Sequence, residues 1–130
     1  MAELSIQEVA KRTGLSAHTL RYYERIGLMA PIKRSESGHR RYSEDDLEWL
    51  VLIQRLRATN MSVQEMQRFA AFVREGDATI GERLALLEAH QQKLTVQLDE
   101  IKQTLALIEH KVTTYRNLQE GRTSTAEGDV

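Results

Sequence analysis

The sequence predicts a mainly α-helical protein with a head of short helices, a small basic hairpin and a long C-terminal helix. Serines that precede an acid by three residues mark several helix starts in the first half. A segment with the single proline interrupts them, and a heptad repeat of apolar residues runs through the second half. These patterns are typical of capped helices, a hairpin and a coiled coil, respectively.

The composition limits the class of protein. A chain of 130 residues is one domain, or one domain with an appendage. The absence of cysteine excludes disulfides, thiolate metal sites and thiol redox switches. No stretch approaches the roughly 18 apolar residues of a membrane span, and no signal segment is evident. We therefore expect a cytoplasmic protein without membrane contact.

Basic residues concentrate near the N-terminus although the net charge is only -1. Residues 1–42 contain eight lysines and arginines against four acids, whereas residues 76–130 contain six against nine. A basic head and an acidic rear give a directional field that orients a protein on a polyanion. Chance unevenness in a neutral protein is the alternative explanation.

Two short helices joined by a tight turn are predicted at residues 6–13 and 17–26. Ser5 lies three residues before Glu8, a spacing at which each side chain can cap the backbone of the other. Gly14 suits the left-handed residue that ends the first helix, and Ser16 suits the cap of the second. The spacing predicts a helix-turn-helix over about residues 5–26, although an αα-hairpin with no role in DNA binding has the same spacing.

The second of these helices exposes cations and phenolic hydroxyls on one face. Leu20 and Tyr23 fall on its inner face, and the outward positions are Thr19, Arg21, Tyr22 and Arg25. Such side chains on one short helix suit a phosphate backbone with base edges beside it. Double-stranded DNA is therefore the expected partner. For Arg25 the alternative is a simple ion pair with an acid.

Helical periodicity is lost over residues 27–42. Pro31 and Gly38 punctuate two short segments, around residues 30–33 and 39–42, with a turn at residues 36–38. The segments carry Lys33, Arg34, Arg40 and Arg41. A basic hairpin beside a helix-turn-helix is a wing, which can reach phosphates or the minor groove.

Two more helices complete a head of residues 1–75. Ser43 and Ser62 precede acids by three residues and predict helices at about residues 44–58 and 63–74. The free amides at the start of the second suit another phosphate. Residues 76–81 break the helical pattern and are predicted to form a linker.

A heptad repeat predicts a dimerisation coiled coil over residues 82–118. Apolar residues recur at alternating steps of three and four without interruption. A narrow apolar seam on so long a helix needs a partner, for which a second copy is the simplest choice; packing back on its own head is the alternative. Gln91 is polar at a core position and can set the register. The seam residues are Leu84, Leu87, Gln91, Leu94, Leu98, Ile101, Leu105, Ile108, Val112 and Tyr115.

Three further expectations concern the C-terminal segment, the histidines and the aromatic residues. Residues 119–130 are polar and are predicted to be disordered. His18, His90 and His110 are expected to be exposed, and none is positioned as a metal ligand. A small apolar effector could sit between head and coil near Trp49, Phe69, Phe72 or Tyr115, but these residues suit a core equally well, and no effector site is assigned.

The order and spacing of the motifs resemble those of the MerR family of transcriptional regulators. The resemblance rests on Ile6-Gln7-Glu8-Val9-Ala10, Gly14-Leu15-Ser16, Thr19-Leu20-Arg21-Tyr22-Tyr23-Glu24, Gly27-Leu28 and Arg40-Arg41-Tyr42. It covers about residues 4–75 and extends through the coil to about residue 118. It implies a winged helix-turn-helix head and a long antiparallel coiled coil that joins two protomers.

The resemblance also implies a mechanism. Family members bind pseudo-palindromic promoter sites as homodimers and bend and untwist an overlong spacer, which realigns the promoter for RNA polymerase. No cofactor or metal is implied for this chain. The implied DNA-binding residues lie on the second helix, at its start and in the wing: Ser16, His18, Thr19, Arg21, Tyr22, Arg25, Arg34, His39, Arg40, Arg41 and Tyr42.

Within the family, the segment 76–80 resembles the subgroup that responds to aldehydes or nitrosative stress. Members of that subgroup often carry a cysteine in the third helix, which this chain lacks, so thiol sensing is excluded and the signal is open. An architectural or excisionase-like DNA-binding protein and a coiled-coil interaction protein are the alternatives. No nucleophile–base set, pair of catalytic carboxylates or phosphate loop points to an enzyme.

Overall fold

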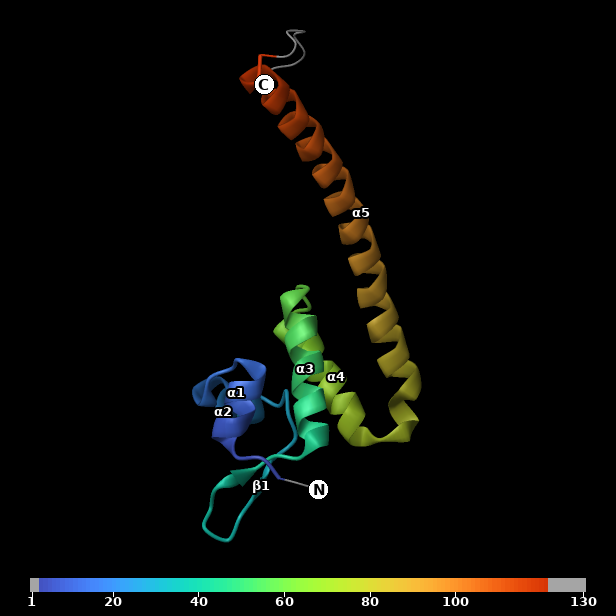
Figure 1. Ribbon diagram of the computed structural model, residues 1–130. Helices are drawn as coiled ribbons and strands as arrows, with labels where there is room; N and C mark the ends of the chain where they lie inside the picture. The colour runs from blue at the N-terminus through green and yellow to red at the C-terminus, as the bar shows by residue number, and fades with distance from the viewer. Residues whose placement is uncertain (1–2, 122–130) are drawn as a thin grey trace. The chain divides into compact units, whose positions relative to one another are not determined.

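The computed structural model describes residues 3–121 and divides them into two compact units, one up to His90 and one from Gln91 onward. The first unit contains α1 (Ile6–Thr13), α2 (Ala17–Arg25), the strands β1 (Lys33–Arg34) and β2 (Arg40–Arg41), α3 (Glu44–Ala58) and α4 (Val63–Glu75). The helix α5 (Ile80–Gln119) begins in the first unit and forms the second (Figure 1).

Local capping explains where α1 and α2 begin and end. The Ser5 hydroxyl accepts the Glu8 N–H at 3.1 Å, and the Glu8 carboxylate accepts the Ser5 N–H at 2.8 Å. These hydrogen bonds hold the pKa of Glu8 below its ordinary value. Gly14 adopts φ 78°, the left-handed conformation expected at that position, and turns the chain into α2.

The wing is a two-stranded antiparallel hairpin in which Lys33 pairs with Arg41 and Arg34 with Arg40. Its strands are shorter than the predicted segments because Pro31 has no N–H to donate and Ile32 donates its N–H to Glu24. Leu4 forms a further antiparallel bridge with Tyr42, which ties the N-terminal segment to the base of the wing.

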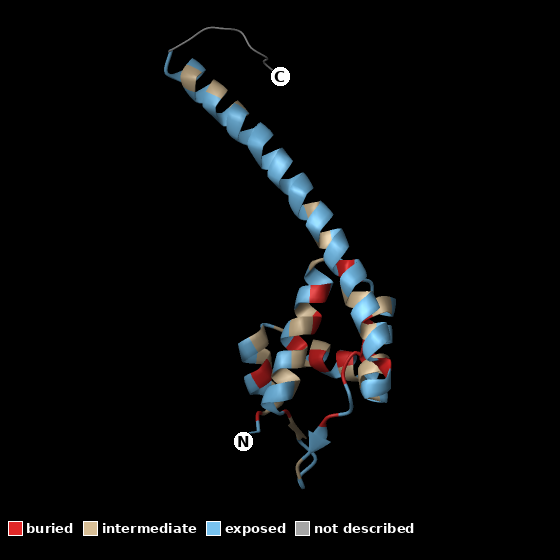
Figure 2. Cartoon of the chain, turned by 90° about the vertical axis from the view of Figure 1, so that its right-hand side faces the viewer, coloured by how far each residue is buried: buried red, intermediate tan, exposed pale blue. Residues whose placement is uncertain are grey.

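The core of the head lies where α1, α2, the base of the wing, α3 and α4 meet. Figure 2 shows the buried residues gathered there. Trp49 and Phe69 stack with centroids 5.6 Å apart, and the Trp49 indole donates to the Leu28 carbonyl at 2.7 Å, so both residues serve the core. The fully buried side chains are Val9, Leu20, Leu28, Tyr42, Leu50, Ile53 and Met66.

The segment at residues 76–81, which was predicted to be a linker, forms a hydrogen-bonded corner. A 3₁₀ turn, η1 (Asp77–Thr79), leads directly into α5 at Ile80. The buried Thr79 hydroxyl donates to the Phe72 carbonyl and accepts the Arg83 Nε–H at 3.1 Å. Arg83 also donates to the Gly76 carbonyl. Side-chain hydrogen bonds therefore order this segment, which its glycine and small residues had not indicated from the sequence.

The first turns of α5 belong to the head, so the compact unit extends beyond the expected boundary at residue 75. Leu86 and Leu87 pack against the core, and His90 is 7% exposed. Leu87, which the heptad assigns to the dimer seam, is thus partly covered by its own head. The expectation that His90 is exposed is also wrong, whereas His18 and His110 are exposed as expected.

Beyond His90 the helix is almost entirely exposed (Figure 2). It stays helical to Gln119 and ends in a hydrogen-bonded turn at Glu120 and Gly121, so the start of the segment predicted to be disordered is ordered. Residues 122–130 of that prediction lie outside those described. No helix within residues 3–121 is long and apolar enough to cross a membrane.

Candidate nucleic-acid interface

The exposed face of α2 carries most of the side chains expected to contact DNA. Ser16, His18, Arg21, Tyr22 and Arg25 are exposed, and Thr19 is half-buried, while Leu20 and Tyr23 anchor the opposite face in the core. The Ser16 hydroxyl caps the helix by accepting the Thr19 N–H at 3.0 Å. The helix therefore presents one polar and cationic side from a rigidly anchored backbone.

Tyr22 and Arg25 form one stacked pair on this face. The Arg25 guanidinium carbon lies 5.4 Å from the centroid of the Tyr22 ring, a cation–π distance. Within residues 3–121 Arg25 has no carboxylate at ion-pair distance, so the simple ion pair considered from the sequence is not formed. The stacking holds a cation and a phenol side by side on the outer surface of α2.

The wing is tied to α2 by a half-buried ion pair. Arg40 Nε lies 2.8 Å from the Glu24 carboxylate, and the two side chains are 18% and 17% exposed. The second oxygen of Glu24 accepts the Ile32 N–H at 3.0 Å. Burial raises the pKa of Glu24, but the hydrogen bonds from Arg40 and Ile32 outweigh it and leave that pKa below its ordinary value. Glu24 thus fixes the hairpin relative to α2 at neutral pH.

The tip of the wing is ordered by its own polar groups. Arg34 Nη1 donates to the Gly38 carbonyl at 2.9 Å, and His39 Nδ1 lies 2.9 Å from the Ser37 hydroxyl. Arg34 and His39 remain exposed, whereas Arg40 and Arg41 are half-buried.

Tyr42 corrects one expected contact. Its side chain is 0% exposed, and its backbone pairs with Leu4 in both directions, so it closes the core at the base of the wing. Burial raises the pKa of the Tyr42 hydroxyl, which has no hydrogen-bond partner among the described residues. A side chain so enclosed cannot reach a nucleic-acid backbone, and the tyrosine that does face outward is Tyr22.

Between α1, α2 and the wing the surface is hollowed into a basic groove of about 300 Å³. The first turn of α1, at residues 5–7, forms one wall. Unpaired N–H groups at a helix start and several guanidiniums favour a phosphate. The cations that line the groove are Arg21, Arg34, Arg40 and Arg41, which the fold brings together from α2 and both strands.

The chain also matches a known family over this region. Residues 4–72 match the model of the family described as MerR HTH family regulatory protein. An HTH-type transcriptional regulator of uncharacterised role from Haemophilus influenzae is 41% identical over 109 residues, covering 84% of this chain and 81% of that protein. The chain belongs to the MerR family.

Further relatives agree with this membership. The transcriptional regulator AdhR of Bacillus subtilis is 41% identical over 91 residues, which cover 70% of this chain and 65% of AdhR. Among solved structures, HiNmlR, a MerR family regulator lacking the sensor domain and bound to promoter DNA, superimposes with a TM-score of 0.84 at 38% identity. The superposition covers 92% of this chain and 94% of that one. This MerR-family chain is accordingly a transcriptional regulator.

One cation of this MerR head was missed by sequence reasoning. Arg57, in the last turn of α3, lines a hollow of about 270 Å³ together with Thr19 and Tyr22 of α2 and Val63 at the start of α4. It thus extends the cationic surface toward the α4 N-terminus, which the sequence had suggested for a phosphate. The position of Arg57 just before the turn that leads to the capped start of α4 could have suggested a role in phosphate binding. Only the tertiary fold, however, places it next to α2.

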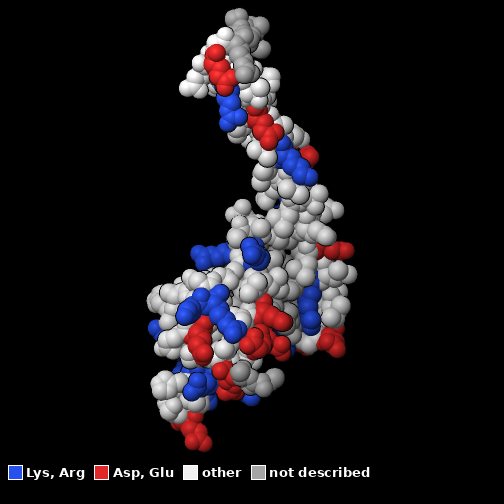
Figure 3. Space-filling model, viewed as in Figure 1, with Lys and Arg blue, Asp and Glu red and all other residues white. Residues whose placement is uncertain are grey.

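Basic and acidic side chains are mixed over the rest of the surface. Figure 3 shows them interleaved on the head and alternating along the exposed part of α5. In the part of the chain that the structure describes, no group of three or more His, Cys, Asp or Glu side chains is placed to hold a metal ion. The basic groove and the outer face of α2 therefore form the candidate interface.

Proposed function

We propose that this MerR-family regulator binds double-stranded promoter DNA as a homodimer, with α2 in the major groove and the wing on the backbone. Arg21 is the main support for this proposal. It lies on the exposed face of α2 and also lines the basic groove, so these two surfaces are continuous. The promoter complex of the similar HiNmlR supports it. Arg21 and the stacked Tyr22–Arg25 pair are the contacts we expect near base edges.

The wing and the helix starts have a different task in this proposal. Arg34, Arg40 and Arg41 neutralise phosphates beside the DNA major groove that α2 occupies. His39 lines the basic groove of the protein, and His18 is exposed on α2. Ser16 and its N-terminal turn approach the backbone in the same way. These contacts position the head and make affinity fall steeply with salt, whereas the contacts of α2 select sequence.

The second copy is required by the surface of α5. Most of the apolar seam residues that follow His90 are exposed in the described chain, and Leu98, Ile101 and Leu105 are each more than half exposed. A hollow of about 310 Å³ lies between Ile101, Thr104, Leu105 and Ile108. In a heptad these four positions form the hole that receives a core side chain of a partner helix.

Charge favours the antiparallel orientation. With parallel helices, Lys111 would face Arg116 of the partner subunit at a flanking position on both sides. In the antiparallel register that pairs Leu98 with Ile108 of the partner subunit, two attractive pairs form, each between Glu88 and Arg116 of the partner subunit. Only one repulsive pair forms, between the two copies of Lys102 at the two-fold axis. Gln91 then lies across from the partner's Tyr115, so the polar core position has a polar neighbour.

Introduced cysteines test this orientation, since the natural chain has none. The double variant Leu98→Cys with Ile108→Cys should form an intermolecular disulfide on oxidation if the proposed register is correct. Leu98→Cys alone should not, because its copies are far apart in antiparallel helices. A disulfide in the single variant would instead indicate parallel helices.

Promoter activity follows from the rigidity of such a dimer. Two heads at a fixed separation can bind half-sites on one DNA face only if the spacer is bent and untwisted, which realigns the promoter elements for RNA polymerase. The protein acts by binding rather than by an enzymatic reaction, and we expect it in the cytoplasm, with the promoter. Its effector, if it has one, does not react with a cysteine, so a role in aldehyde or nitrosative stress would need another chemistry.

Footprinting on the promoter region upstream of the gene and its divergent neighbour tests the proposal. Protection centred in an overlong spacer, with hyperreactive bases at its centre, is the expected result. Arg21→Ala and Tyr22→Phe should weaken this protection while the dimer persists. Protection at scattered sites without a preferred spacer would instead indicate an architectural protein, and no salt-sensitive binding to any DNA would refute the function.

A further inference from the structure

His90 is the buried polar residue at the point where α5 leaves the head. It is 7% exposed, and among the described residues of α5 it alone is buried. The compact head ends at His90, and the next residue of α5, Gln91, is a position of the seam proposed for the dimer. A histidine at such a place needs a hydrogen-bond partner, because burying an imidazole without one is costly.

The partner is the cap of α3. His90 Nε2 lies 2.8 Å from Oγ1 of Thr59, the residue that ends α3. The Thr59 hydroxyl has a single proton, which it donates to the Arg55 carbonyl at 2.7 Å, with the Leu56 carbonyl at 3.2 Å. With the hydroxyl proton on the Arg55 carbonyl, the Thr59 oxygen is left to accept from the imidazole, an arrangement that needs the His90 proton on Nε2.

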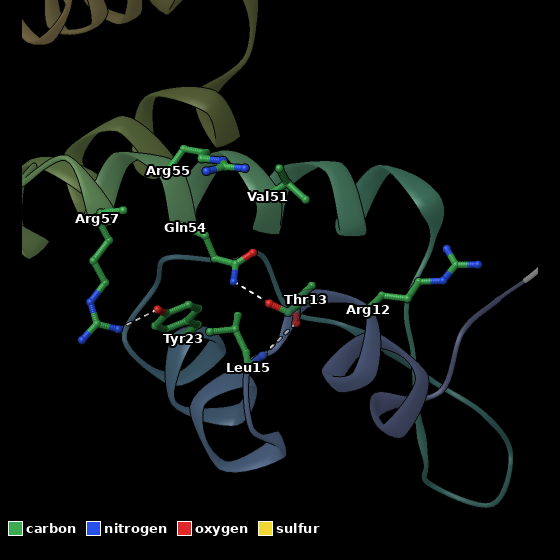
Figure 4. A pocket seen from close by; sticks show the side chains of 9 residues that line it. Arg12, Thr13, Leu15, Tyr23, Val51, Gln54, Arg55 and Arg57 are labelled. Atoms are coloured by element: carbon green, nitrogen blue, oxygen red, sulfur yellow. Dashed lines mark hydrogen bonds between the residues drawn. The ribbon is translucent and has the colours of Figure 1, made fainter. Parts of the chain in front are cut away.

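The last turn of α3 leads from this contact to the recognition helix. Thr59 holds the turn by its hydroxyl and by its N–H, which donates to the Arg55 carbonyl at 3.1 Å. Arg57, in the same turn, donates from Nη1 to the Tyr23 hydroxyl at 3.0 Å (Figure 4). Tyr23 is the buried anchor of α2 and is next to Tyr22, whose ring centroid lies 6.4 Å away.

We propose that His90 is a positioning residue that couples the dimerisation helix to the recognition helix through Thr59, the last turn of α3, Arg57 and Tyr23. This inference rests on the proposed function. A change in the pairing of α5 acts first at His90, where the helix is attached to the head. Loss of the His90 hydrogen bond loosens the α3 cap, and Arg57 then no longer holds Tyr23 and the face of α2 in the geometry that binds DNA.

Three variants of full-length protein test the coupling by affinity for an operator duplex, with the dimer checked by light scattering. His90→Leu keeps the bulk but removes the donor, and we expect operator affinity to fall about tenfold, within the usual range for coupling between sites. His90→Gln retains an N–H donor and should recover most of the affinity. Gln92→Leu, an exposed position two residues on, is the matched control and should change affinity less than about twofold.

A double-mutant cycle separates coupling from general destabilisation. Tyr23→Phe removes the hydroxyl that Arg57 contacts, and its effect should be much smaller in the His90→Leu background than in the natural protein. Losses that multiply independently would overturn the proposal. So would an affinity of His90→Leu that equals that of Gln92→Leu.

Two measurements do not depend on DNA binding. Nitrogen NMR of the free protein should show His90 protonated at Nε2, and a neutral ring protonated at Nδ1 would overturn the assignment. Amide exchange at Thr59 and Met61, whose N–H groups bond to the Arg55 and Leu56 carbonyls, should accelerate in His90→Leu and not in Gln92→Leu. If these results appear in a protein that binds no promoter, the proposed function fails while the coupling stands; unchanged exchange overturns the coupling.

Discussion

Removing the Glu24 carboxylate should both destabilise the head and release the wing. In Glu24→Ala, Arg40 loses its ion-pair partner at 2.8 Å and the Ile32 N–H loses its acceptor at 3.0 Å. Both side chains of the pair are more than four-fifths buried, so water replaces the lost contacts only in part. A charged hydrogen bond that leaves a partner unsatisfied costs about 1.5–3 kcal/mol, and we expect about 2 kcal/mol because the pair lies near the surface.

Thermal unfolding at a fixed protein concentration measures this loss. For a unit the size of the head, about 2 kcal/mol corresponds to a decrease in Tm of roughly 10 °C. Glu36→Ala is the matched control, because it removes the same charge from the exposed tip of the wing, where Glu36 forms no ion pair with another described residue. A Tm for Glu24→Ala within about 2 °C of the Glu36→Ala value, on the same scale of about 4–8 °C per kcal/mol, would refute the reasoning.

The same carboxylate makes a prediction about pH. The pKa of Glu24 in the folded protein is below the ordinary value of 4.5, so the unfolded chain binds the proton more readily. The stabilisation by the charged form is therefore complete above the ordinary value and decreases as the pH falls through the lower, folded-state pKa. Glu24→Gln should accordingly differ most from the natural protein near neutral pH, and the difference should shrink in acid.

Three other predictions concern the core, the coil and the groove. Tyr42→Phe should leave stability within about 1 kcal/mol and operator affinity unchanged, because the buried hydroxyl has no partner in the described chain to lose; a marked loss of affinity would restore Tyr42 as a contact. Ile101→Asp should convert the dimer to monomer in sedimentation experiments, whereas Leu107→Asp, at a position 70% exposed and outside the seam, should not. Arg34→Ala should reduce the slope of log affinity against log salt by about 1, because Arg34 lines the groove proposed to bind phosphate, and an unchanged slope would refute that role.

Local sequence patterns were sufficient to predict the helices and the outward face of α2. The bounds of α1 and α3 agree with the prediction because serine caps and a left-handed glycine act over three or four residues. Leu20 and Tyr23 are buried and Arg21 and Tyr22 exposed because helical periodicity alone separates those two faces.

What lies against each face of a helix depends instead on the tertiary packing. Periodicity shows that Leu87 is apolar, but not that its own head covers it; His90 finds Thr59 across 31 residues, and Arg57 finds Tyr23 across 34. Tyr42 follows two wing arginines in sequence yet closes the core, because the bridge to Leu4 turns its side chain inward. Capping and periodicity are local interactions, whereas these contacts depend on how the helices pack, and no spacing along the chain encodes that packing.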